Sequence, residues 1–430
     1  MTDTRVADPT ERPVVLTIAG SDSGGGAGIQ ADLKTIEATG GFGTSAITAV
    51  TAQNTTGVES SHVLPVGEIA AQIDAVRSDF DVRAVKTGML ATAEVVDRVA
   101  DYAADLEVPV VVDPVMVAAS GDRLLSEEAE SAYETLIAEA ALVTPNVDEV
   151  AVLTGLEPTD EAGAIDAGEA IRSMGADAAL IKGGHIPGSA VLDALVTAAG
   201  SETFRHPRVD TDATHGSGCT LSAAIATRLA RGDSLVEAVE TSVSFMARAV
   251  RYHHAAGEGP GPVHHLVGIR NDAARTATTE TVHDAVERLP GSETDGLLVD
   301  PDNVAAATPY AETVEDVAAL DGGFTVTDGE LVSGGAVRFG VADDLARILL
   351  DARESDPSLC VALECRLTTG LDAALADAGW ERLGTDRIDD GAGLMTESGP
   401  IAVSGGDGSV TSDDSVVLIA RAFDPVLDLI

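Results

Sequence analysis

Six short apolar runs recur along the chain up to about residue 265, and longer helical patterns separate them. Continuous runs spaced in this way are typical of strands that are buried on both faces of a parallel sheet. We therefore expect an α/β fold, a mostly parallel sheet with helices on both faces. The runs are Val14–Ile18, Ser45–Val50, Val82–Lys86, Val108–Val112, Ala141–Thr144 and Ala178–Lys182.

Polar side chains and glycines follow every one of these runs. Ligands of such sheets bind where the strands end, and the carboxyl ends of parallel strands share one edge of the sheet. Six polar segments in these positions therefore predict a site along that edge. The segments are Gly20–Asp32, Gln53–Asn54, Lys86–Met89, Asp113–Pro114, Thr144–Glu149 and Lys182–His185.

A glycine pair, Gly216-Ser217-Gly218, leads into Cys219 and an alanine-rich helical pattern. Small residues expose backbone N–H groups, and a helix N-terminus adds unpaired donors and partial positive charge. This combination predicts a nest for an anion such as phosphate. The same dipole would favour a Cys219 thiolate or steady a developing charge. A turn that only caps a packed helix, with Cys219 in the core, fits the segment equally well.

Two carboxylates are the best candidates for Mg²⁺, which proteins often hold through water. Asp113 and Glu149 each follow a buried-type strand, and Asn146 lies three residues before Glu149. Lys182 is one of only three lysines among 26 basic residues, and a compact ammonium suits a phosphate oxygen. With Cys219 as a candidate base, these groups indicate phosphoryl transfer.

Other polar residues receive a structural interpretation. Gly24–Gly28 lacks the G-x-G-x-x-G spacing of dinucleotide loops, so we favour close approach of a substrate over a nicotinamide or flavin site. A solvated helix face is the alternative for both Asp32 and Lys34, and we adopt it for Lys34. Lys86 could be a second lysine for phosphate, but we favour a structural cap, and we expect Asp148 as surface charge. His185 and His215 adjoin the motifs but could be turn residues. The pairs His253-His254 and His264-His265 read as loop residues.

The chain carries a formal net charge of −45. Such a charge repels nucleic acid and anionic membranes, so we expect neither as a partner. We interpret the composition as that of a folded protein adapted to a high-salt cytosol; a strongly acidic protein from ordinary salt is the alternative. The N-terminus has no apolar core, and no apolar run reaches the ~20 residues of a membrane span, so we expect a cytoplasmic protein. The three cysteines form no disulfide framework or CxxC pair.

A glycine- and proline-rich stretch, Gly257–Pro262, closes the first unit, and a second region with mixed patterns starts near Thr281. We expect two domains, residues 1–268 and residues 280–430, the second being a smaller α/β or α+β unit.

Several motifs in order make residues 13–266 resemble the hydroxymethylpyrimidine/phosphomethylpyrimidine kinases of the ribokinase-like fold. They are TIAGSDSGGGAGIQADLKT, ITAVTAQNT, VKTGML, VVDPVMVAASGDRLL, VTPNVDEVAVLTG, IKGGH and HGSGCTLSAAIA. The resemblance implies that ATP phosphorylates the alcohol of a hydroxymethylpyrimidine and then the resulting phosphate, with Mg²⁺. A pyridoxal-type kinase is the alternative for this domain, and a homo-oligomer stays open.

The resemblance also implies roles for single residues. Cys219 matches the catalytic base, and Gly216, Ser217 and Gly218 match the anion hole. Lys182 matches the lysine that contacts phosphate, with Asn146 beside it at the nucleotide, and Asp113 and Glu149 match the magnesium region. The positions that match the pyrimidine pocket are Gly20, Asp32, Gln53, Met89 and Val115.

The second region resembles the archaeal-type thiamin-phosphate synthases that are fused to such kinases. The matching segments are Val299–Leu320, Phe339–Leu350, Glu364–Arg366 and Asp386-Arg387. Asp344 stands where that family has a histidine, its Gly-Lys-Glu-Pro segment is not recognisable in Met395–Gly408, and no lysine follows Lys182. We therefore expect no synthase activity. A ligand-sensing or structural domain is an alternative role.

Overall fold

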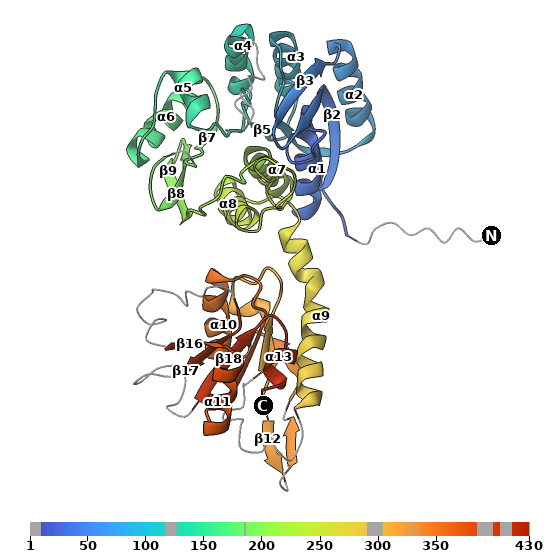
Figure 1. The fold of residues 1–430 in the computed structure, drawn as a ribbon. Helices are drawn as coiled ribbons and strands as arrows, with labels where there is room; N and C mark the ends of the chain where they lie inside the picture. The colour runs from blue at the N-terminus through green and yellow to red at the C-terminus, as the bar shows by residue number, and fades with distance from the viewer. Residues whose placement is uncertain are drawn as a thin grey trace, which may run out of the picture. The chain divides into compact units, whose positions relative to one another are not determined.

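A computed structural model describes residues 10–116, 127–184, 186–289, 304–322, 324–327, 330–333, 335–384, 399–404 and 415–429. The chain divides into two compact units, Met1–Val267 and Gly268–Ile430 (Figure 1).

The first unit is built on a parallel sheet, as the six apolar runs predict. Its parallel strands lie in the order β2-β1-β4-β5-β6-β7. They are β1 (Val14–Ser21), β2 (Phe42–Asn54), β4 (Val82–Thr87), β5 (Val110–Val112), β6 (Leu142–Val143) and β7 (Ala178–Ile181). The expected α/β fold is confirmed.

Three antiparallel strands extend this sheet, and the sequence analysis did not predict them. β3 (Gly57–Val63) pairs with β2 at one edge, and β8 (Ala190–Thr197) pairs with β7 near the other, followed by β9 (Gly200–Pro207). The exposed strands β3 and β9 are rich in polar residues, so they lack the apolar run on which the prediction depended.

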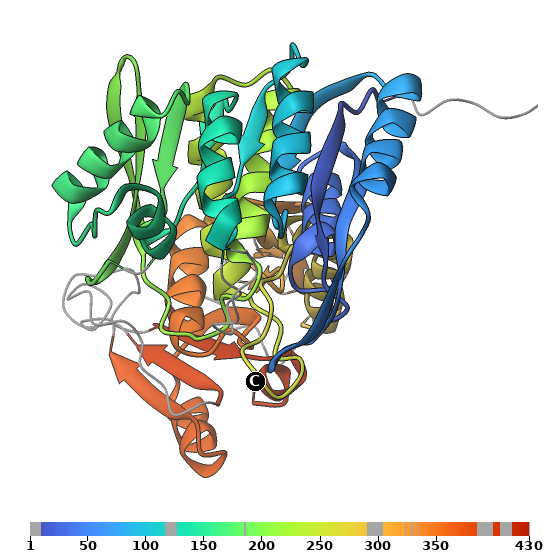
Figure 2. The ribbon, with the colours of Figure 1, turned by 90° about the horizontal axis from the view of Figure 1, so that it is seen from above.

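Two layers of helices cover the sheet (Figure 2). One face carries α1 (Gly28–Ala38), α7 (Ser217–Ala230) and α8 (Leu235–Arg251), and the other carries α2 (Val66–Asp79), α3 (Ala93–Ala104), α4 (Glu127–Ala138) and α6 (Glu161–Ser173). Helix α3 illustrates the local cause: Thr92 caps it by accepting the Val95 N–H, and its buried side chains recur every three or four residues.

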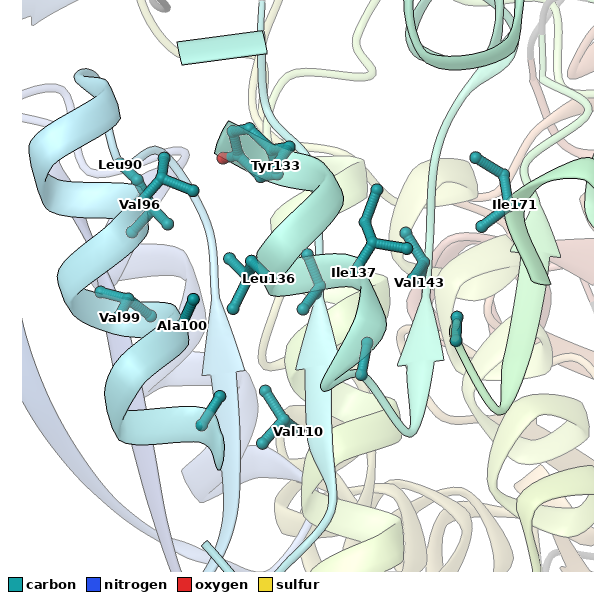
Figure 3. Close-up of a cluster of buried hydrophobic side chains, with 14 of the residues drawn as sticks. Leu90, Val96, Val99, Ala100, Val110, Tyr133, Leu136, Ile137, Val143 and Ile171 are labelled. Atoms are coloured by element: carbon teal, nitrogen blue, oxygen red, sulfur yellow. The ribbon is translucent and has the colours of Figure 1, made fainter. Parts of the chain in front are cut away.

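The core between α3, α4 and the sheet is mainly aliphatic, with Tyr133 among its buried side chains (Figure 3). Leu136 and Ile137 of α4 pack between the side chains of α3 and the strand residue Val143, all of them fully buried or nearly so. Burying each such side chain contributes about 1.5–3 kcal/mol. This packing holds β5 and β6 in register, and the residues after these strands belong to the candidate site.

The second unit is a mainly antiparallel sheet in the order β14-β11-β10-β15-β18-β17-β16, in which only β16 and β17 run parallel. The strands are β10 (Val304–Ala307), β11 (Val317–Leu320), β14 (Val337–Phe339), β15 (Val361–Arg366), β16 (Glu381–Gly384), β17 (Ile401–Ser404) and β18 (Ser415–Ala420). A separate hairpin joins β12 (Phe324–Thr327) to β13 (Glu330–Ser333).

Helices cover both faces of this second sheet. In β10, Val304 and Ala306 pack with α9 (Val267–Arg288) and α11 (Thr369–Asp377), whereas Ala305 and Ala307 pack with α10 (Asp343–Ser355). The alternation follows from the two-residue period of a strand. The unit is thus the smaller mixed domain that the sequence predicts.

Helix α9 includes residues 269–279, which the sequence-based division assigns to neither domain. Asn271 donates to Asp316 Oδ1 at 2.6 Å, and the Arg275 guanidinium lies 3.6 Å from the centroid of the Phe339 ring. These contacts tie the helix to the second sheet. Among the helices that the structure describes, none combines the length and apolar character that crossing a bilayer requires.

Candidate active site

The strand ends of the first sheet meet at one edge, as predicted. The Asp113 N–H donates to the Thr87 carbonyl at 3.0 Å, and the Lys182 N–H donates to the Pro145 carbonyl at 2.9 Å. Lys182 also pairs with Asn146 in an isolated parallel bridge. Residues that are far apart in the sequence therefore become neighbours along this edge.

One lysine lies between two carboxylates in this cluster. Lys182 Nζ is 2.8 Å from Asp113 Oδ1 and 3.8 Å from Glu149 Oε2. Hydroxyl groups complete the Asp113 environment: Thr144 donates to Oδ1 at 3.3 Å and Ser222 to Oδ2 at 3.4 Å. The structure thus brings together Lys182 and both predicted magnesium residues.

The two carboxylates of this cluster shift the protonation of their neighbours. Burial, opposed by Lys182 and reinforced by the neighbouring Asp113, raises the pKa of Glu149 to about 7. Although burial by itself lowers the pKa of Lys182, Asp113 and Glu149 raise it above its usual value, so the ammonium stays charged. A further cation beside Glu149 would favour its charged form.

Asn146 has a structural task that the sequence analysis did not assign. It is the N-cap of α5 (Val147–Thr154): its side chain accepts the Glu149 N–H at 2.9 Å, and Glu149 Oε2 accepts the Asn146 N–H at 2.8 Å. This capping box satisfies two helix N–H groups and fixes the Glu149 side chain beside Lys182.

The predicted nest is present at the start of α7. Gly216 is its N-cap and adopts φ +82°, a left-handed conformation that favours glycine. A Cβ on Gly218 would lie 3.1 Å from Lys182 Nζ and 3.5 Å from Asp113 Oδ2. The first turn of α7 therefore lies beside the lysine, an arrangement that fits the predicted anion site.

Cys219 follows the nest directly and has a free thiol. Burial raises the pKa of this thiol to about 11; the charge of Lys86 and a hydrogen bond from the Gly28 N–H act in the opposite direction. Of the two effects expected for the helix dipole, a resting thiolate is not favoured, because burial raises the pKa of the thiol. Steadying a charge that develops on the sulfur stays a prediction.

Asp32 and Lys86 form an ion pair whose side chains are 0% exposed, with Lys86 Nζ 2.9 Å from both carboxylate oxygens. The Thr17 hydroxyl donates to Asp32 Oδ2 at 2.6 Å. The alternative of a solvated helix face for Asp32 is wrong, and Lys86 is a core residue beside Cys219. The pair joins α1 to β4 under the nest.

The other pocket positions lie at the ends of β1, β2, β4 and β5. A Cβ on Gly20 would lie 2.3 Å from the Met89 methyl group, so a larger residue at position 20 would require the flexible end of the Met89 side chain to move. Gln53 is partly exposed, and its backbone exchanges hydrogen bonds with the Ser23 hydroxyl at 2.6 and 2.8 Å. Val115 is partly buried two residues beyond Asp113.

Sequence reasoning missed several residues that hold the site together. Asp22 organises the glycine loop, and the hydroxyls of Thr17, Thr144 and Ser222 bind the buried carboxylates. Only Asp22 had a local signal, since an aspartate before glycines is typical of a turn that accepts backbone N–H groups.

The remaining predictions have mixed outcomes. Lys34 and Asp148 are exposed, as expected. His264 and His265 lie in a loop but are only 2% and 3% exposed. His185 lies outside the described residues.

The donor set fits Mg²⁺ through water better than through direct contact. In the described part of the chain, no three His, Cys, Asp or Glu side chains come together as a set of metal ligands. Asp113 and Glu149 already accept hydrogen bonds from protein donors, and a hydrated cation beside them would favour the charged form of Glu149.

Comparisons with known proteins agree with this geometry. The family model described as phosphomethylpyrimidine kinase matches residues 22–264, and the one described as thiamine-phosphate synthase ThiN matches residues 282–403. The hydroxymethylpyrimidine/phosphomethylpyrimidine kinase of Streptomyces coelicolor is 48% identical over 258 residues, which cover 60% of this chain and 96% of that protein.

Two solved structures show the same fold. Phosphomethylpyrimidine kinase of Clostridium difficile has a TM-score of 0.50 and 40% identity, covering 56% of this chain and all of its own. Pyridoxal kinase of Staphylococcus aureus with AMP-PCP and pyridoxal has a TM-score of 0.57 and 32% identity, covering 61% and 96%. The family model matches more than half of this chain, and the chain therefore belongs to the phosphomethylpyrimidine kinase family.

Proposed function

We propose that the first unit transfers the γ-phosphoryl group of ATP to the alcohol of 4-amino-5-hydroxymethyl-2-methylpyrimidine and then phosphorylates the product to the diphosphate. The observation that carries this proposal is the meeting of the nest with Lys182, 3.1 Å from a Cβ position on Gly218, immediately before Cys219. Family membership and the kinase names of the relatives support the substrate and the cosubstrate.

Each group at the strand ends has a task in this reaction. The N–H groups of Gly218 and Cys219 and the Lys182 ammonium bind the transferred phosphoryl oxygens, where charge accumulates. The thiolate form of Cys219, a small fraction near neutrality, accepts the proton of the alcohol. Mg²⁺, held through water by Asp113 and Glu149, would neutralise phosphate charge. The pyrimidine is held by Gly20, Gln53, Met89 and Val115. Asp32 supports this pocket through its buried ion pair with Lys86.

The preferred acceptor is the first test. With Mg-ATP in molar KCl, the full chain should convert the pyrimidine to its diphosphate through the monophosphate, with kcat/KM at least about 10-fold above that for pyridoxal. Chromatography of the products measures both steps, and a reaction without protein gives the background. A preference for pyridoxal, the substrate named for the Staphylococcus neighbour, would replace this assignment.

For the second unit we propose a domain that makes no thiamin phosphate. Asp344, in the first turn of α10, is largely exposed and lies 3.8 Å from Arg347; Asp343 is in the same turn. A helix N-terminus attracts phosphate, but two carboxylates there repel it. Asp386 and Arg387 lie outside the described residues, as does most of Met395–Gly408. The synthase-family match keeps an active synthase as the alternative.

This second proposal predicts a negative result with a clear readout. Full chain supplied with the pyrimidine diphosphate and thiazole phosphate should form no more thiamin phosphate than a reaction without protein. The kinase step, run in the same tube, is the control that the chain is folded. Robust turnover would mean that Asp344 is wrongly aligned or that another residue has taken the histidine's role.

We also propose that the protein works in the cytoplasm of a cell with high internal salt, with small molecules as its partners. The net charge of −45 supports the high-salt setting, because screening makes the self-repulsion tolerable, and the same charge repels nucleic acid and anionic membranes as partners.

A further inference from the structure

Two loops that are far apart in the sequence of the first unit lie backbone to backbone beside the nest. One is the glycine-rich loop, Asp22–Gly28; the other contains His215 and Gly216. A Cβ on Gly216 would lie 1.8 Å from the Gly26 carbonyl oxygen, and a Cβ on Gly26 would lie 2.6 Å from His215 Cδ2. The two loops leave no space for any side chain at either glycine.

Asp22 determines the shape of the glycine-rich loop. Its carboxylate is 2% exposed and accepts three backbone N–H groups: Gly24 at 2.7 Å on Oδ1, and Gly26 at 2.8 Å and Ala27 at 2.7 Å on Oδ2. Although burial raises the pKa of Asp22, hydrogen bonds from His215 and from the backbone outweigh this effect and lower it, so the group is ionised.

His215 connects this carboxylate to the nest. Its Nε2 lies 3.3 Å from Asp22 Oδ2, and because a carboxylate only accepts, the ring nitrogen donates. The next residue, Gly216, is the N-cap of α7. The side chain is 13% exposed and lies against Gly26. On the other side, Lys34 donates to the Gly25 carbonyl at 2.7 Å and the His265 ring to the Gly26 carbonyl.

We propose that the Asp22–His215 pair is a positioning device that holds the glycine-rich loop in register with the nest during phosphoryl transfer. The nest binds the transferred group, while the glycine-rich loop ends at Gly28, whose N–H donates to Cys219. This role requires no contact of the pair with either reactant. It acts by keeping two reacting groups aligned, where a shift of about 1 Å costs about 10²-fold in rate. The inference rests on the proposed kinase activity.

Two substitutions separated by one methylene test this role. His215→Gln places an N–H donor where Nε2 stands, whereas His215→Asn has an amide that is one bond too short. We expect H215N to lower kcat for the pyrimidine by about 10–100-fold with the KM for ATP nearly unchanged. H215Q should recover most of that loss. His283→Asn, at an exposed position on α9, is the matched control and should behave as wild type.

The second readout is ATP hydrolysis without an acceptor. Misaligned loops should impair transfer to the alcohol more than transfer to water, so H215N should consume more ATP per phosphorylated pyrimidine. The double variant D22N/H215N should be no slower than the slower of the two single variants, because both substitutions remove the same Asp22–His215 contact. Equal losses in transfer and hydrolysis together with a lower Tm, or equal kcat for H215N and H215Q, would overturn the positioning role. Failure of the proposed function would appear earlier, as a wild-type chain that phosphorylates no pyrimidine.

Discussion

Cys219→Ala is expected to lower kcat by about 10²–10⁴-fold while nucleotide binding stays nearly intact, the usual effect of removing a general base. The sulfur follows the nest directly, accepts a hydrogen bond from the Gly28 N–H and lies in the field of Lys86. Alanine removes the proton acceptor but leaves the backbone N–H groups that bind phosphate. Stopped assays of pyrimidine phosphate and calorimetric titration with an ATP analogue measure the two quantities.

Cys360→Ala is the control, because it removes a partly exposed thiol from the second unit. It should leave kcat unchanged. If C219A instead weakened nucleotide binding with little change in kcat, Cys219 would be a packing residue, the alternative that the sequence left open.

The pH dependence of the same residue follows from its pKa. With a thiol pKa of about 11, raised above its ordinary value by burial, only a small fraction of Cys219 is ionised near neutrality. That fraction grows with pH. Alkylation of Cys219 by iodoacetamide, followed by mass spectrometry, should therefore accelerate about tenfold per pH unit up to about pH 11. A rate that levels off near pH 7 would mean that the resting group is a thiolate.

The positions of the site residues could be predicted because apolar runs locate buried strands. A run that ends at Val112 places Asp113 at the sheet edge, and a run that ends at Lys182 places that lysine there too. Parallel pairing of β5 and β7 with β6, which lies between them, brings both residues to the same edge, and their side chains meet at 2.8 Å. The nest could also be predicted, because its glycines directly precede or begin the helix in the sequence.

Features that depend on distant partners could not be predicted. Asp32 on a helix reads as solvated until its pairing with Lys86, 54 residues further along the chain, is known. The Asp22–His215 contact spans 193 residues. Strand β3 has no buried face, so its sequence carries no apolar run. Its pairing with β2 makes it a strand. In each case a single local sequence pattern fits two environments, and tertiary contacts decide between them.

Removing salt is expected to abolish activity by unfolding the chain. The 71 acidic residues exceed the 26 basic ones by 45. The Debye length is about 3 Å at 1 M salt and about 30 Å at 0.01 M, so dilution lets carboxylates repel one another across much of a domain. Circular dichroism and pyrimidine phosphorylation, followed from 2 M to 0.01 M KCl (~200-fold), should show a common loss of signal.

Equal ionic strength of choline chloride should protect the fold nearly as well as KCl, because screening depends on charge and not on the identity of the cation. An unchanged Tm and full activity in dilute buffer would instead favour the alternative of an acidic protein from ordinary salt.

Salt should change the number of folded molecules more than the rate of each one. The Asp32–Lys86 pair is 0% exposed and the Lys182 side chain is 14% exposed, and buried pairs are screened far less than surface charges. We therefore expect kcat per folded molecule to stay nearly constant through the transition, with the folded fraction taken from circular dichroism. A kcat that falls before the dichroism changes would place the salt-sensitive charges at the active site instead of at the surface.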